Sequence, residues 1–98
     1  GRRGRNKTAL EPILLQINPN PLQQEGVIEL FVPMSDIVSL QLYNINGISV
    51  ANLLANVSPL ASQQKTPLAV QTLPTGLYTL VLTTRSGQVA AQQVLVVR

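Results

Sequence analysis

Residues 26–44 read GVIELFVPMSDIVSLQLYN, and in this stretch apolar side chains recur at every second position. The alternation is carried by two runs, 26–32 and 36–44. Successive side chains of a β-strand point to opposite faces, so a period of two is typical of a strand with one face buried. The stretch therefore predicts two half-buried strands, with one face formed by Ile28, Leu30 and Val32 and by Val38, Leu40 and Leu42.

Turn residues separate these runs from their neighbours. Asn18-Pro19-Asn20-Pro21 ends a first apolar run, because two X-Pro bonds favour extended and turn conformations and cannot continue a strand ladder. Asn46-Gly47 predicts a hairpin with a type I′ turn, which needs two residues that tolerate a positive φ. Ser86-Gly87 predicts another hairpin.

The spacing of apolar runs and turns predicts seven strands and one domain. The polar stretch between Pro59 and Pro67 is expected to connect the two sheets, and residues 52–57 are the one stretch that suits a short helical turn. Seven short strands at this spacing are typical of an Ig-like seven-stranded antiparallel β-sandwich, here without the cysteine pair and tryptophan of antibody domains. The expected strands are 13–17, 26–32, 36–44, 48–53, 68–72, 77–84 and 88–97.

Basic residues are concentrated at the N-terminus. Four of the seven Lys and Arg residues lie within residues 1–7, and the rest of the chain carries three basic side chains against four acidic ones. We divide the chain into a flexible basic arm, 1–12, and a sandwich domain, 13–98. Such an arm can bind nucleic acid through counterion release. The domain adds no second basic cluster and few aromatics for base stacking, which favours a solvated linker or a cloning remnant and no nucleic-acid partner.

The sequence offers no catalytic site. It contains neither His nor Cys, which removes the commonest metal ligand and general base. The carboxylates are Glu11, Glu25, Glu29 and Asp36. On a strand, Glu25 and Glu29 would lie about 13 Å apart, too far for a glycosidase pair. We therefore expect no enzyme activity, no cofactor, no metal ligand and no small-molecule substrate.

LPTGLY, residues 73–78, resembles a Gram-positive sortase tag at first sight. The tag needs a residue between Pro and Thr and a following membrane span, and neither is present. As a turn before the sixth strand, Leu73 would anchor the segment in the core. Pro74 would fix φ, and Gly76 would supply backbone freedom. Tyr78 would form a tyrosine corner, with its hydroxyl bonded to the main chain a few residues upstream.

The motifs together resemble the type A C-terminal sorting domain of the type IX secretion system of Bacteroidota. The family pattern is matched, in order over residues 13–98, by Pro19-Asn20-Pro21, by Tyr43 with Asn46-Gly47, by Leu73, Pro74, Gly76, Leu77 and Tyr78, and by Gly87 before a terminal strand through Val97. Two departures stand out. Asn18 replaces the usual aromatic before Pro-Asn-Pro, and Gln92 and Gln93 stand where lysines are common.

This resemblance implies a sorting function. Such a domain ends a larger secreted protein, directs it from the periplasm through the outer-membrane translocon, and is read by a shuttle protein and a sortase-like protease before the cargo reaches the cell surface or the medium. The arm would then be the linker from the cargo. The terminal residues Val94, Leu95, Val96, Val97 and Arg98 complete the expected recognition set.

Several alternatives stay open at this point. A shuttle could read the terminal hairpin through side-chain pockets or by adding a strand to a free edge. The apolar end could be buried in a partner or in the domain's own core. An Ig-like or fibronectin-type accessory module, acting as a spacer or binding carbohydrate, shares the sandwich, although few aromatics are available for stacking on sugars. The oligomeric state is not indicated.

Overall fold

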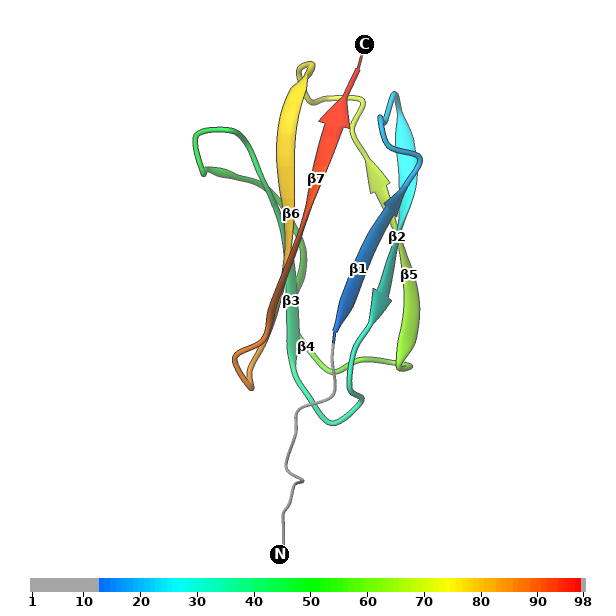
Figure 1. Cartoon of the computed structure of the whole chain (residues 1–98), viewed down its shortest axis with the longest axis vertical. Helices are drawn as coiled ribbons and strands as arrows, with labels where there is room; N and C mark the ends of the chain where they lie inside the picture. Colours follow the sequence, from blue (N-terminus) through cyan, green and yellow to red (C-terminus); the bar gives the residue numbers. More distant parts are fainter. Residues whose placement is uncertain (1–12, 98) are drawn as a thin grey trace, which may run out of the picture.

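Two antiparallel sheets face each other in the computed structural model, which describes residues 13–97 (Figure 1). The three-stranded sheet has the order β1-β2-β5, and the four-stranded sheet has the order β4-β3-β6-β7. This arrangement confirms the expected Ig-like sandwich. The strands are β1 (Leu14–Asn18), β2 (Glu25–Phe31), β3 (Val38–Tyr43), β4 (Ser49–Val57), β5 (Gln63–Ala69), β6 (Gly76–Thr84) and β7 (Val89–Val96).

The core lies between the sheets and is built by the alternation seen in the sequence. The six side chains expected to share the inward faces, Ile28, Leu30, Val32, Val38, Leu40 and Leu42, are all buried. They are joined by inward residues of β1, β6 and β7, such as Leu15, Leu80 and Val94. Each fully buried Leu, Ile or Val stabilises the fold by about 1.5–3 kcal/mol relative to an exposed one.

Two segments differ from expectation because they form sheet edges. Residues 52–57 are not a helical turn but the second half of β4, which pairs only with β3. Three register shifts interrupt that pairing, so the apolar side chains of β4 lose their period of two. The polar stretch 60–66 is only partly a connection, because β5 begins at Gln63 and pairs with β2. An edge strand tolerates polar residues and Pro67, because it has no second neighbouring strand to pack beside or to receive a backbone hydrogen bond from Pro67.

Both hairpins expected from glycine dipeptides are present, with one turn type different from the prediction. Gly47 has a φ of 78°, and its N–H donates to Asn44 O at 3.0 Å, while Asn46 keeps a negative φ. This is a three-residue loop with glycine in the left-handed position rather than a type I′ turn. Gly87 (φ 102°) repeats the arrangement, donating to Thr84 O at 3.0 Å.

Candidate recognition site

Three motifs that are far apart in the sequence meet at one end of the sandwich. Gly76 pairs with Val96 across β6 and β7, and Leu22 forms a parallel bridge to the same Val96. The 19–24 segment, the turn before β6 and the end of β7 therefore gather at the C-terminal end (Figure 1). The Asn46-Gly47 hairpin projects sideways from the four-stranded sheet, and Gly87 lies at the opposite end. Arg98 lies outside the described residues.

The Pro-Asn-Pro segment pairs with the outer edge of β7. The Asn20 side chain donates from Nδ2 to Gln93 O at 2.9 Å and accepts at Oδ1 from Leu95 N at 3.1 Å. Leu22 continues the ladder, donating to Leu95 O at 2.8 Å and accepting from Val97 N at 2.8 Å. The Asn18-Pro19 and Asn20-Pro21 peptide bonds are both cis. The Asn20 side chain and the Leu22 backbone thus make the hydrogen bonds that a neighbouring strand would make along the last part of β7.

This pairing bears on how a partner could read the terminal strand. The outward N–H and C=O groups at the end of β7 are already bonded, so an added strand cannot use them while residues 20–22 stay in place. Val94 and Val96 are fully buried in the domain's own core. Leu95 and Val97 keep part of their surface outside. Along residues 93–97 of β7 this geometry therefore leaves side chains, rather than the strand edge, open to a partner.

The tyrosine corner forms as expected. Tyr78 is buried, and its hydroxyl donates to Pro74 O at 2.7 Å. Leu73 packs half-buried against the core, and its N–H donates to Val70 O at 3.0 Å. Gly76 does not have the positive φ expected of it, and a Cβ there would meet nothing closer than Tyr78 Cε1 at 3.9 Å. The turn is held by Leu73, Pro74 and Tyr78, without special freedom at Gly76.

The sequence reasoning missed two residues of this site. Leu22 is fully buried and provides two of the bonds to β7. Gly26 lies beneath the same segment, where a Cβ would stand 2.7 Å from Asn18 O and 2.5 Å from Leu22 Cδ2. A glycine inside a strand often marks a close approach of another backbone, and this was the available signal.

A groove opens beside the paired segment. It has a volume of about 650 Å³ and is lined by Pro19, Pro21, Gln23, Gln24, Glu25 and Val97. The lining combines proline rings, two carboxamides, one carboxylate and the side chain of Val97. Among residues 13–97, no group of three His, Cys, Asp or Glu could hold a metal ion. No helix of that part of the chain could span a membrane.

The opposite end is fastened by Asp36. Ser86 Oγ donates to its Oδ2 at 2.5 Å, and Ile37 N donates to Oδ1 at 2.8 Å. The Ser86 hydroxyl is the main reason that the pKa of Asp36 lies below its ordinary value of 3.8, and the backbone N–H groups add to the effect. This contact ties the β2–β3 loop to the Gly87 hairpin.

The fold and this site together define a small Ig-like sandwich with a groove on its surface. The family model described as the secretion system C-terminal sorting domain matches residues 16–97. The chain belongs to this family of type IX secretion sorting domains, which confirms the resemblance inferred from its sequence. No curated protein matches the chain.

A solved structure shares the fold. The crystal structure of dimeric latent PorU from Porphyromonas gingivalis superposes with a TM-score of 0.67 at 20% sequence identity. The match covers 90% of this chain and 10% of the PorU chain. The present chain therefore resembles one small part of that larger protein.

Proposed function

We propose that this domain directs a cargo protein, joined to its N-terminal side, from the periplasm through the outer-membrane type IX translocon. In this proposal a shuttle protein and a sortase-like protease recognise the domain, and the cargo ends at the cell surface or in the medium. Family membership supports the sorting role. The domain itself needs no catalytic group, because sorting requires only a distinctive surface.

We place the recognition surface at the groove beside Pro-Asn-Pro and Val97. The observation that carries this proposal is the convergence of three of the family motifs on the end of β7, with Asn20 and Leu22 holding that strand. A partner would then read side chains along the groove rather than add a strand to β7. Because Glu25 is the one charged residue among the described residues that line the groove, we expect contacts that are mainly apolar and hydrogen-bonded.

A fusion tests the function. Residues 1–98 are attached to the C-terminus of a fluorescent protein that carries an N-terminal Sec signal, and the fusion is expressed in a type IX-competent bacterium. Fluorescence in the medium or on the cells, lost in a translocon mutant, is the expected result. Fluorescence trapped in the periplasm would contradict the sorting role and favour an accessory module, a spacer or a carbohydrate-binding unit.

A matched pair of variants tests the surface. Val97→Asp places a charge in the groove and is expected to lower export at least about tenfold, the equivalent of about 1.4 kcal/mol of binding. Met34→Asp makes the same kind of change at an exposed position of the opposite end and should leave export unchanged. Gln23→Arg repeats the groove test at an exposed residue, in case Val97→Asp unfolds the domain. Equal export of groove and control variants would overturn the placement.

A further inference from the structure

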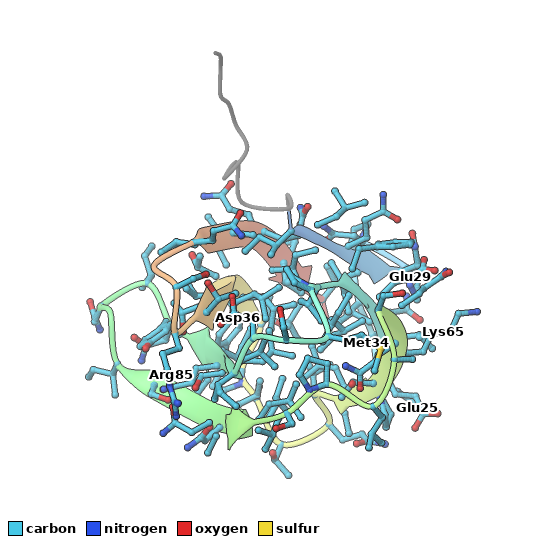
Figure 2. All side chains as sticks on the ribbon, turned by 90° about the horizontal axis from the view of Figure 1, so that it is seen from below. Glu25, Glu29, Met34, Asp36, Lys65 and Arg85 are labelled. Carbon is cyan, nitrogen blue, oxygen red and sulfur yellow. The ribbon has the colours of Figure 1, made fainter. Side chains whose placement is uncertain are left out.

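The four-stranded sheet carries no charged residue. None of the side chains of β3, β4, β6 and β7 is Asp, Glu, Lys or Arg. The charged residues of the described part lie elsewhere: Glu25, Glu29 and Lys65 on the three-stranded sheet, and Asp36 and Arg85 in loops at one end (Figure 2). A surface sheet without charge lacks the usual protection against association.

The outer face of this sheet is partly apolar. Leu77 and Leu95 lie opposite each other in the β6–β7 register, and each is 40% exposed. Val89 lies on the same face of β7, and Tyr43 lies on the same face of β3. The remaining outward side chains are Ser, Thr, Gln and small apolar residues. Leu77, Leu95 and Tyr43 gather at the end of the sheet nearest the β3–β4 hairpin, whereas Val89 lies at the other end, opposite Thr83. Exposed apolar side chains gathered in this way mark an interaction site.

A projection and a hollow occur side by side on this face. The β3–β4 hairpin bends outward from the four-stranded sheet (Figure 1), with Ile45 80% and Ile48 59% exposed. We call residues 44–48 the finger. Between the finger and the sheet lies a hollow of about 400 Å³, whose floor includes Tyr43, Leu77, Thr79 and Val81.

We propose that two copies of this chain associate through these outer faces, with the finger of each copy in the hollow of the other. A two-fold interface brings the same patch of both copies together, so the patch must fit itself. A finger with two exposed isoleucines meets that requirement beside a hollow whose lining includes Tyr43, Leu77 and Val81 together with polar Thr79 and Gln93. The missing charges mean that no like charges are brought together across the two-fold axis.

The available area is sufficient for such a contact. Four strands about 4.8 Å apart and about eight residues long give a face of roughly 500 Å², and hence roughly 1,000 Å² for two copies before the fingers are counted. That is about the lower limit for a specific interface. The contact is expected to be face to face rather than edge to edge, because the register shifts of β4 make that edge irregular.

Sedimentation equilibrium of the 98-residue chain, from about 10 µM to about 1 mM, tests the proposal. We expect the mass to rise from 10.6 kDa towards twice that value, with little dependence on salt. Leu77→Arg places two like charges in the interface and should raise the dimer Kd at least about tenfold. Val27→Arg is the control, because Val27 is 44% exposed on the three-stranded sheet and its change should leave the Kd unaltered.

The outcomes separate this proposal from its rivals. A chain that stays monomeric throughout the range overturns it, and the face is then open to a different protein. A dimer that tolerates Leu77→Arg but not Val27→Arg also overturns it. Ile45→Arg repeats the test at the tip of the finger, where the side chain is 80% exposed and its replacement leaves the core intact. Export of the fusion is measured separately and does not depend on this result.

Discussion

The carboxamide of Asn20 is bonded on both sides to the edge of β7, as an acceptor for Leu95 N and a donor to Gln93 O. Asn20→Ala removes both bonds, and we expect it to lower the free energy of unfolding by about 1–2 kcal/mol. Asn20→Asp should cost at least as much, because a carboxylate cannot donate to the carbonyl. Urea denaturation measures the change. Gln23→Ala, at an exposed neighbour, is the control, and an equal effect of both variants would contradict the role of Asn20.

Alanine substitutions of two glycines at the same end are expected to differ in their effect on stability. Gly26→Ala pushes a methyl group against Asn18 O and Leu22, and we expect a loss of about 1–3 kcal/mol as the 18–22 segment shifts. Gly76→Ala meets only an ordinary contact at 3.9 Å and has no positive φ to strain. It should change the stability by less than about 0.5 kcal/mol. Thermal melts of the two variants and the parent measure the effect. The expected result is a lower melting temperature for Gly26→Ala than for Gly76→Ala, and the reverse would contradict it.

At the other end, Asp36 makes stability depend on pH. Its pKa is lower in the folded chain than in the unfolded one, so its contribution is present above 3.8 and is lost as the pH falls through the folded pKa. Asp36→Asn should therefore be less stable than the parent at about pH 7, with a difference that shrinks below about pH 4. Urea denaturation at both pH values checks this. A difference that persists unchanged in acid would point to a cause other than the charge.

Among the elements, β7 combines a paired and an open length of edge. The amides of Leu95 and Val97 are bonded to residues 20–22, whereas the outward amide of Ala91 has no partner in the described part of the chain. Amide hydrogen exchange should be slow at Leu95 and Val97 and fast at Ala91, because exchange follows the opening of hydrogen bonds. Fast exchange at Leu95 and Val97 would show that the 19–22 segment leaves the edge readily.

The elements also show what a sequence can predict. Strands β2, β3 and β6 were located correctly because each has neighbours on both sides and must alternate between core and surface. The second half of β4 and most of β5 were missed, because register shifts interrupt the pairing of β4, and β5 is rich in polar residues and contains Pro67. The edge strands β1 and β7 were located correctly, because their burial still alternates. Periodicity reports the alternation between core and surface, and a strand with register shifts or few apolar residues carries little of that signal.

At the scale of the whole molecule, the tyrosine corner could be predicted from the sequence, and the contact between the Pro-Asn-Pro segment and β7 could not. Tyr78 and Pro74 are four residues apart, and their bond follows from local turn geometry. Asn20 and Leu95 are separated by 75 positions, and their bond depends on which sheet edge lies beside the first loop. Nothing local encodes that choice of edge, and the glycine inside the strand at position 26 signals only that some other backbone lies close.

The placement of the core leads to a last prediction, about the boundary at residue 12. Every buried apolar side chain of the described part lies between Leu15 and Val96. A chain of residues 13–98 should therefore unfold in one transition, with a free energy within about 0.5 kcal/mol of the full chain and the same dependence on urea, because the slope follows the surface exposed. Removing residues 94–98 instead deletes the fully buried Val94 and Val96 and should abolish the transition. A large loss on removing residues 1–12 would mean that the domain begins earlier than the sandwich does.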